Sequence, residues 1–375
     1  MNHWKPGTLA AQAAGHTSAS GGVVGAIELS TTYVRNEAYD LPDTGDIYRR
    51  DTNETVREAE AVIAALEGAA EVRLFASGMA AISTVLRAAP GPVAVQAGTY
   101  YGTAVFARDL EAAGRPVVTF DPADLASLEA VCAQRPSLVH IETPSNPFLT
   151  VVDIEKAAAL AHHCGAVLSV DSTAATPILT KPLALGADIV VHSATKALNG
   201  HSDVLAGAVA VADPALPIWV RVLEIRAHEG AVLSPFEAYL LTRGMRTVHL
   251  RVAEQCRNAA HVASWLAAQP QVSAVRYPGL AGHPGHQIAQ RQMVGGFGGL
   301  LSFDVAGRDE ALTLLSRLTL IKRATSLGGV ESLIEHRHSV EPAFTGMPPG
   351  LLRLSVGIEA VDDIVADLAQ ALAGI

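Results

Sequence analysis

Short hydrophobic runs alternate with helical patterns along the first two thirds of the chain. The runs VRLF, PVAV, PVVTF, LVHIE, AVLSVD and DIVVHSA are separated by segments such as MAAISTVLRA and DIEKAAALAHHCG, in which hydrophobic residues recur at helical spacing. Strands that are apolar on both faces and separated by helices indicate a mostly parallel sheet that helices cover on both sides. We therefore expect a large α/β unit.

One helix is especially well marked, and it begins after Asn53. Asn53 can cap the first turn, hydrophobic residues recur at helical spacing from Val56 to Leu66, and Gly68 can end the helix. The residues before about position 46 are rich in Gly, Ser, Thr and Ala and show no such periodicity, which predicts an irregular arm that lies on another surface.

The pattern changes after about residue 245. One long helical stretch, EAYLLTRGMRTVHLRVAEQCRNAAHVASWLAA, precedes the strand-like runs SAVRY, LLSFDV, LIKRA and LLRLSV and the helical runs DEALTLLSRL and VDDIVADLAQALAG. These patterns predict a smaller α+β unit. The expected division is an arm at 1–46, a large domain at 47–245 and a small domain at 246–375.

Composition narrows the class of protein. The chain has 375 residues, of which 49% are hydrophobic and 17% charged, so it can bury a large core and some of its apolar surface can lie in a subunit interface. A net charge of −10 argues against a nucleic-acid partner. Three cysteines lie far apart in the sequence, and no apolar run approaches the roughly 18 residues that span a membrane. We expect a cytoplasmic protein with reduced thiols and no membrane segment.

Candidate chemistry gathers directly after the apolar runs, where ligands bind in parallel sheets. The segments there are ASGMAAIS, AGTYYGT, IETPSNP, VDSTAATP and HSATKALNGH. Each residue has an ordinary structural interpretation when taken alone: Ser77 and Gly78 can simply begin a helix, Asp171 can cap a turn, Tyr101 can pack, and Lys196 can be a solvated charge.

Together, these residues fit the needs of pyridoxal phosphate. A partly desolvated lysine such as Lys196 can attack the cofactor's carbonyl, and Asp171 can keep the pyridine nitrogen protonated. Tyr101 can lie against the ring. The phosphate needs N–H groups at a helix N-terminus, which Gly78 and Met79 can offer, and hydroxyls, which Ser193 and Thr195 can offer.

The same segments resemble the Cys/Met-metabolism, or trans-sulfuration, family of enzymes. The resemblance runs from LSTTY through YRRDTNETVREAEAVIAALEG, SGMAAI, IETPSNP, VDSTAATP and GADIVVHSATKALNGH to SLGGVESLIEH and LLRLSVGIE. It implies the type I fold of pyridoxal-phosphate-dependent transferases, similar to aspartate aminotransferase. It also implies a homodimer with shared active sites, of which two pair into a homotetramer.

The resemblance assigns a role to each matching position. Lys196 is similar to the lysine that forms a Schiff base with the cofactor and moves protons, and Tyr101 to the tyrosine that stacks on the ring and assists proton transfer. Asp171, Gly78, Met79, Ser193 and Thr195 correspond to cofactor ligands, Tyr48 and Arg50 to a pair that reaches the neighbouring subunit's cofactor phosphate, and Arg353, Asn146 and Ser326 to residues around the substrate carboxylate.

Several positions depart from the family pattern and bear on the substrate. Ser172 and Ala174 stand where an asparagine and an aromatic residue are usual, and Thr325 stands where cystathionine γ-enzymes often have a glutamate. Methionine γ-lyases carry a cysteine two residues after the stacking tyrosine, whereas this chain has Thr103, which disfavours a dedicated methionine lyase. We expect γ-elimination or γ-replacement at C–S or C–O bonds of cystathionine or an O-acylhomoserine, as in cystathionine γ-lyase and γ-synthase.

Other interpretations stay open at this point. Within the family they are cystathionine β-lyase and O-acylhomoserine sulfhydrylase, and outside catalysis a binding protein that keeps the fold. The intact Lys196, Asp171 and Arg353 argue against a non-catalytic protein, and no GxGxxG follows the first strand as a Rossmann dehydrogenase requires. The histidines of EHRH and GHPGH do not supply a full ligand set, so we expect no metal.

Overall fold

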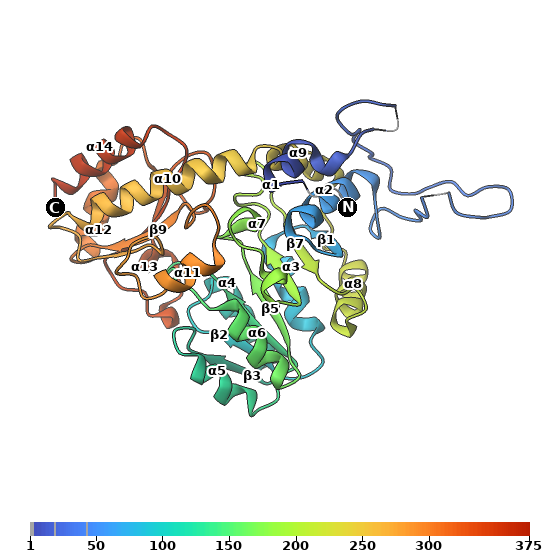
Figure 1. Cartoon of the computed structure of the whole chain (residues 1–375), viewed down its shortest axis with the longest axis horizontal. Helices are drawn as coiled ribbons and strands as arrows, with labels where there is room; N and C mark the ends of the chain where they lie inside the picture. The colour runs from blue at the N-terminus through green and yellow to red at the C-terminus, as the bar shows by residue number, and fades with distance from the viewer. Residues whose placement is uncertain (1–3, 19, 43) are drawn as a thin grey trace.

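Two β-sheets lie side by side in the computed structural model, which describes residues 4–18, 20–42 and 44–375 (Figure 1). The first sheet has seven strands and the second has five. Helix α10 (Val248–Ala267) runs along the top of the view and contacts helices or strands of both halves. The two-part organisation agrees with the change of pattern near residue 245.

The seven-stranded sheet has the order β1-β7-β6-β5-β4-β2-β3. Its strands are β1 (Glu71–Phe75), β2 (Val93–Gln96), β3 (Val117–Phe120), β4 (Leu138–Glu142), β5 (Val167–Asp171), β6 (Ile189–His192) and β7 (Gly207–Val211). Strands β2 to β6 are parallel, whereas β7 runs antiparallel to both β1 and β6. The mostly parallel sheet is confirmed. The sequence analysis missed β7, because its GAVAV run consists of small residues and lacks the long apolar side chains of the other strands.

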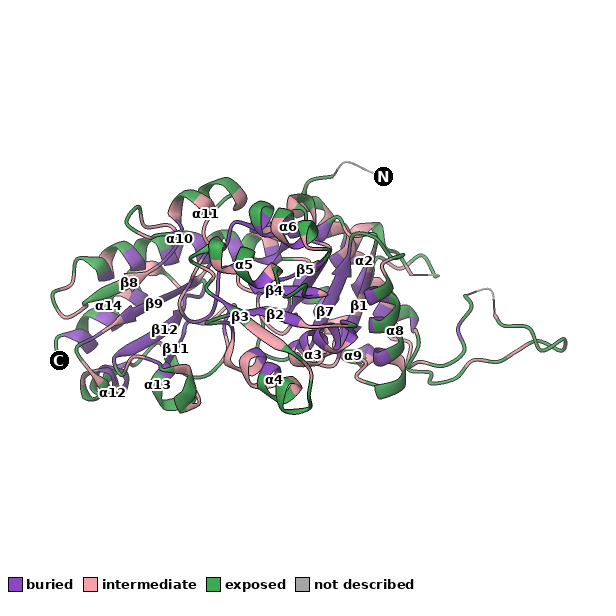
Figure 2. Ribbon diagram, turned by 90° about the horizontal axis from the view of Figure 1, so that it is seen from below, coloured by how far each residue is buried: buried purple, intermediate pink, exposed green. Residues whose placement is uncertain are grey.

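Helices cover both faces of this sheet and bury its apolar strands (Figure 2). On one face lie α3 (Gly78–Ala88), α4 (Tyr101–Ala112) and α8 (Pro217–Glu229). On the other lie α5 (Leu125–Cys132) and α6 (Ile154–His163), together with α2 (Glu54–Glu67) and α7 (Thr176–Leu179). The alternation of strands and helices therefore produces the expected three layers.

Helix α2 forms where its end signals predict. The Asn53 side chain accepts hydrogen bonds from the backbone N–H groups of Thr55 and Val56, and Gly68 ends the helix with a φ of 74°. Because L-residues with a Cβ adopt that backbone conformation at a cost, glycine is the natural residue there.

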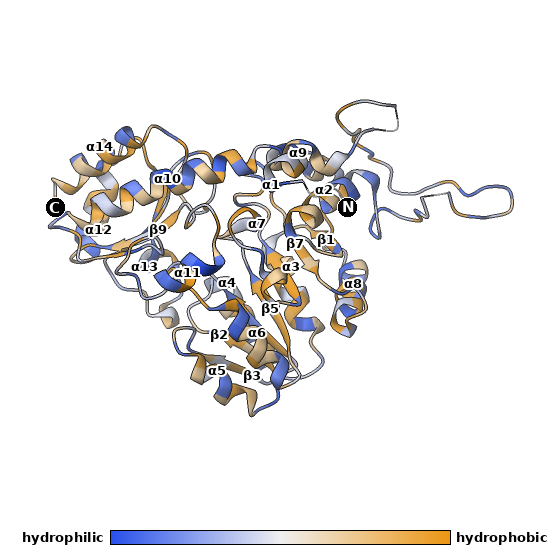
Figure 3. Cartoon of the chain, viewed as in Figure 1, coloured by the Kyte–Doolittle hydropathy of each residue, from blue (hydrophilic) through white to orange (hydrophobic). Residues whose placement is uncertain are grey.

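The five-stranded sheet has the order β10-β11-β12-β9-β8 and is mostly antiparallel. Its strands are β8 (Ala274–Arg276), β9 (Leu300–Asp304), β10 (Lys322–Arg323), β11 (Leu333–His336) and β12 (Leu351–Ser355), and it packs against α10, α12 (Arg308–Arg317) and α14 (Val361–Leu372). Helices α11 (His286–Gln292) and α13 (Arg337–Val340) lie in connections; α11 is hydrophilic in Figure 3, whereas the strands of the large sheet are hydrophobic. Strand β11 was not predicted.

The long helical stretch predicted before this sheet is two helices, α9 (Pro235–Met245) and α10. They are separated at Arg246 and Thr247. Helix α10 is tied to the segment after β6 by Arg251, whose guanidinium donates to the carbonyls of Ala197 at 2.8 Å and Leu198 at 3.3 Å.

The N-terminal segment begins with the short helix α1 (Pro6–Ala11), which packs on α2 and α10. The chain then extends away from the body in two loops before it reaches α2 (Figure 1). Large hydrophobic side chains on this part are exposed, among them Val23, Leu29, Val34 and Tyr39. The irregular arm is thus present, and described residues of the same chain leave much of its apolar surface uncovered.

Two cysteines that are distant in the sequence meet between α5 and α6. The Sγ atoms of Cys132 and Cys164 are 3.0 Å apart, and both thiols are free, as is the buried Cys256. Within the described residues, no helix combines the length and apolar character needed to cross a bilayer.

Candidate active site

A cavity lies at the carboxyl ends of the parallel strands and collects most of the predicted cofactor ligands. Its lining includes Gly78, Met79, Asn146, Asp171, Ser193, Thr195 and Lys196. The first two come from the start of α3, Asp171 ends β5, and the last three follow β6. These residues meet because parallel strands present their carboxyl ends at one edge of the sheet.

The start of α3 forms one end of the cavity. Ser77 caps the helix by accepting a 3.0 Å hydrogen bond from the N–H of Ala80, which leaves the N–H groups of Gly78 and Met79 for an anion. A Cβ on Gly78 would lie 2.7 Å from the Ser193 Cβ. Glycine therefore allows the helix to approach the hydroxyls that follow β6, and the combination suits a phosphate.

Lys196 is held in the same cavity by a contact with the second half of the molecule. Its Nζ donates a 2.9 Å hydrogen bond to the Ser326 Oγ. Burial, followed by the positive charge of Arg353, lowers the pKa of Lys196 to about 8, while Glu335 opposes this shift. A lysine with such a pKa is partly neutral near neutral pH, and a neutral amine is the nucleophilic form.

Asp171 lies beside a second carboxyl group that the sequence analysis did not single out. Glu142 ends β4 opposite Asp171 in the parallel pair β4–β5, and its side chain accepts hydrogen bonds from the N–H groups of Tyr100 and Asn146. Burial and the neighbouring Asp171 carboxylate raise the pKa of Glu142 well above its usual value. Like Asp171, Glu142 stands at the end of an apolar run, and that position was the available signal.

Tyr100 is the aromatic residue on the cavity wall, directly before Tyr101, whose expected stacking role stays a prediction. Tyr100 lines the cavity and Tyr101 does not. Helix α4 begins at Tyr101, whereas Tyr100 precedes it and its N–H donates a hydrogen bond to the Glu142 carboxyl group. Burial, followed by interaction with Tyr101, raises the pKa of Tyr100 to about 12, so its hydroxyl stays protonated. Because the two tyrosines are adjacent, the sequence alone does not indicate which of them lines the cavity.

Arg353 projects from β12 toward the same site and is almost fully buried. Its Nη1 donates to the Asn146 Oδ1 at 3.1 Å and its Nη2 to the Ser326 carbonyl at 2.9 Å. Ser326 has a φ of 107°, a strained value for a residue with a side chain. The three predicted substrate-side residues are therefore together, and Ser326 touches both Lys196 and Arg353.

Tyr48 and Arg50 do not line this cavity. Both side chains are exposed, and the Arg50 guanidinium lies 5.2 Å from the centre of the Tyr48 ring. They stand where the arm joins α2. A single chain therefore does not bring this pair to the predicted cofactor site.

The residues that depart from the family pattern take different places. Ala174 lines the cavity, Ser172 is fully buried, and Thr325 donates a 2.6 Å hydrogen bond to Glu335. Among the predicted histidine clusters, His336 and His286 bind backbone carbonyls, and the described residues contain no group of three potential metal ligands.

Comparison with known proteins places this geometry in a family. The sequence model of the Cys/Met metabolism PLP-dependent enzymes matches residues 7–373. The chain belongs to this family. Its fold, its pyridoxal phosphate cofactor and its nature as an enzyme agree with the expectations from the sequence.

Individual relatives include enzymes of two names. The cystathionine γ-synthase of Mycobacterium bovis is 43% identical over 366 residues, which cover 94% of this chain and 93% of that protein. The L-methionine γ-lyase of Fusobacterium nucleatum subsp. polymorphum is 42% identical over 348 residues, which cover 88% and 87%. A solved structure of cystathionine γ-synthase from Xanthomonas oryzae pv. oryzae, in complex with aminoacrylate and cysteine, superposes with a TM-score of 0.94 at 36% identity and covers 99% of this chain and 98% of that one. These names fit γ-elimination and γ-replacement chemistry.

Proposed function

We propose that this enzyme catalyses γ-elimination or γ-replacement at a C–S or C–O bond of cystathionine or an O-acylhomoserine. The observation that carries the proposal is the meeting of Lys196 and Arg353 at Ser326, because it places a proton-transferring amine beside a carboxylate-binding guanidinium. The likeness to cystathionine γ-synthases over nearly the whole chain supports the same conclusion.

The residues in the cavity fit pyridoxal phosphate. The start of α3 and the Ser193 and Thr195 hydroxyls would hold its phosphate, Asp171 its ring nitrogen, and Lys196 its carbonyl carbon. When bound, the cofactor supplies an electron sink for the charge that forms at the substrate Cα.

The protein's own groups then divide the remaining work. Arg353 binds the substrate carboxylate and fixes the orientation of Cα, with Asn146 and Ser326 holding the guanidinium. Lys196 takes the Cα proton and returns a proton to the substrate, which its lowered pKa favours near neutral pH. Tyr100, protonated and placed on the cavity wall, covers the ring and assists the leaving group by donating its proton. The proposal gives Tyr100 the stacking and proton-transfer role that the sequence analysis expected of Tyr101.

Elimination and replacement share their first steps and differ in how the reaction ends. Elimination would release 2-oxobutanoate and ammonia, and replacement by cysteine would form cystathionine. Since stacking is assigned to Tyr100, the position two residues later is Gly102 rather than Thr103, and it too lacks the cysteine expected of a methionine γ-lyase. The competing activities are those of cystathionine β-lyase and O-acylhomoserine sulfhydrylase. Membership of an enzyme family and the intact site both argue against a non-catalytic binding protein.

The assembly that we propose is a homodimer with shared active sites, two of which form a homotetramer in the cytoplasm. The exposed hydrophobic residues of the arm at 1–46 need a surface to cover, and a second copy supplies one. Tyr48 and Arg50, exposed at the base of the arm, would reach the cofactor phosphate of that copy. The domains would divide at 47–245 and 246–375.

Product analysis tests the proposed reaction. The purified protein with its cofactor is incubated with L-cystathionine, and separately with O-succinyl- or O-acetylhomoserine plus either cysteine or sulfide, and the products are identified by mass spectrometry. Cysteine with 2-oxobutanoate, or cystathionine formed from an acylhomoserine, would support γ-chemistry. Homocysteine with pyruvate would show β-elimination, and a reaction of acylhomoserine with sulfide alone would show a sulfhydrylase; either result would replace the proposal.

A further inference from the structure

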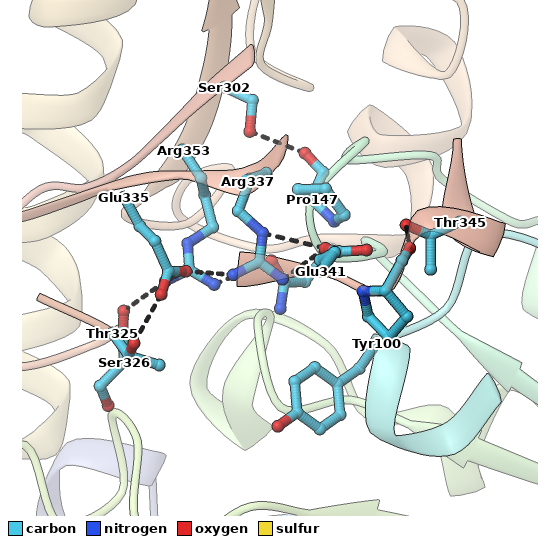
Figure 4. Close-up of polar contacts among 12 residues, drawn as sticks. Tyr100, Pro147, Ser302, Thr325, Ser326, Glu335, Arg337, Glu341, Thr345 and Arg353 are labelled. Carbon is cyan, nitrogen blue, oxygen red and sulfur yellow. Dashed lines mark hydrogen bonds and ion pairs between the residues drawn. The ribbon is translucent and has the colours of Figure 1, made fainter. Parts of the chain in front are cut away.

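Four buried charges form a cluster next to the cavity (Figure 4). They are Glu335, Arg337, Glu341 and Arg353, and none of the four side chains is more than 5% exposed. Two cations and two anions balance, as they must where water cannot screen them. The sequence analysis did not identify Glu335, Arg337 or Glu341 as site residues; they lie in the segment LIEHRHSVE.

Strand pairing explains why these charges meet. Glu335 on β11 stands opposite Arg353 on β12 in the antiparallel ladder. Arg337 begins helix α13 directly after β11 ends at His336, and Glu341 follows Arg337 by one helical turn. The backbone thus brings two guanidinium groups to one carboxylate.

Glu335 interacts with three donors. Its Oε2 forms an ion pair with the Nη2 of Arg353 at 2.9 Å and accepts a hydrogen bond from the Nη1 of Arg337. Its Oε1 accepts from the hydroxyl of Thr325 at 2.6 Å. One carboxylate cannot neutralise two guanidinium groups, so each retains part of its positive charge, and Arg337 obtains the rest from Glu341.

Arg353 consequently keeps binding capacity. A guanidinium has five N–H donors; Asn146 and the Ser326 carbonyl each accept one, and Glu335 forms an ion pair with the Nη2 atom. The buried Nε of Arg353 has no hydrogen-bond partner among the described residues. Since an unsatisfied buried donor is unfavourable, this nitrogen favours an anionic ligand.

We propose that Arg337 is a positioning residue, which holds Glu335 in place and so keeps Arg353 available for the carboxylate of an amino-acid substrate. The proposal rests on the proposed function, in which Arg353 binds that carboxylate. Without Arg337, Glu335 would pair with Arg353 alone, and its carboxylate would compete with the substrate carboxylate for the Arg353 guanidinium.

A binding experiment tests this role apart from turnover. L-Alanine and L-alaninamide, which differ in the carboxylate, are titrated by calorimetry into the holoenzyme and its variants. Wild type should prefer L-alanine. Arg337→Met should weaken L-alanine binding by about tenfold, the size of one charge-assisted hydrogen bond, with little change for the amide. The matched control, Arg221→Met, removes an exposed arginine that forms an ion pair with Glu224 in α8 and should change neither.

Two further variants distinguish positioning from a general structural role. The double variant Glu335→Gln/Arg337→Met removes the competing anion together with its partner and should regain most of the L-alanine affinity. Arg337→Lys keeps the positive charge but loses the planar guanidinium that spans Glu335 and Glu341. It should show an intermediate loss of affinity for L-alanine with little change for L-alaninamide, and this loss can be measured even if Arg337→Met does not fold.

Three results would overturn the inference. Equal losses for both ligands in Arg337→Met would indicate a structural role. Unchanged L-alanine binding in Arg337→Met, or in Arg337→Lys where only that variant folds, would show that Arg353 needs no such partner. If wild type itself showed no preference for L-alanine, the assignment of Arg353 would fail and the inference with it, whereas loss of the proposed reaction alone would appear only in the product analysis.

Discussion

Lys196 and Ser326 lie 130 positions apart in the sequence, and the lysine Nζ donates a 2.9 Å hydrogen bond to the serine hydroxyl. Lys196 follows β6 of the large sheet, while Ser326 lies in the connection between β10 and β11 of the small sheet. The site is therefore built from both halves of the chain. The strained φ of Ser326 lies at the point where the two halves meet.

The lowered pKa of Lys196 predicts a pH-dependent cost to the folded, cofactor-free protein. The pKa of Lys196 is about 8 in the folded protein, whereas 10.5 is the ordinary value that applies to the unfolded chain. Between pH 8 and pH 10.5 the unfolded chain therefore binds more protons than the folded protein, and the free energy of unfolding rises with pH. Below pH 8, Lys196→Met should therefore be more stable than wild type by about 2–3 kcal/mol, and the difference should shrink toward pH 10.5. Urea unfolding of both proteins across this range measures it. A pH-independent difference would contradict the assigned pKa.

The assignment of the stacking ring predicts unequal effects for two neighbouring tyrosines. Tyr100→Phe should lower kcat by roughly 10²-fold because a protonated hydroxyl on the cavity wall is lost. Tyr101→Phe serves as the matched control and should change kcat by less than about threefold, since Tyr101 does not line the cavity. Steady-state kinetics of both variants decide, and a larger effect at Tyr101 would restore the original assignment.

The close approach of α3 to the segment after β6 predicts that Gly78 tolerates no side chain. In Gly78→Ala the new Cβ would lie 2.7 Å from the Ser193 Cβ, which should cost about 1–3 kcal/mol and displace the groups that hold the phosphate. Thermal unfolding and cofactor loss on dialysis, followed by visible absorption, check both effects. Gly114→Ala is a suitable control, because a Cβ there meets nothing within 4 Å, although its positive φ adds a backbone cost. Full cofactor retention in Gly78→Ala would refute the cradle.

The proposed exchange of Arg50 between subunits predicts complementation. Arg50→Ala and Lys196→Ala should each be nearly inactive alone, because one loses a phosphate ligand and the other the reacting amine. When the two are co-expressed, half of the dimers are mixed and one site in each mixed dimer is intact, so about a quarter of wild-type activity should return. No recovery in purified mixed dimers would argue against a shared site.

The cofactor side of the site could be predicted from the sequence better than the substrate side. Gly78, Asp171 and Lys196 each follow an apolar run, and the parallel sheet brings such positions together whatever the details of packing. Arg337 and Glu335 carry no such signal, because their meeting with Arg353 depends on the register of two antiparallel strands, one of which the pattern did not reveal. The sequence did not indicate that Tyr100 lines the cavity, because the start of α4 at Tyr101 and the hydrogen bond from the Tyr100 N–H to Glu142 depend on the fold.

Arg251 gives the long helix α10 a direct hold on the reacting segment. Its guanidinium binds the carbonyls of Ala197 and Leu198, the two residues that follow Lys196, and a Cβ on Gly200 would meet that same guanidinium at 1.8 Å. Because α10 also packs on the small sheet, a displacement of that sheet would be transmitted through this helix to the backbone that carries Lys196. We therefore expect that any displacement of the small sheet, which carries Arg353, would also alter the position of Lys196.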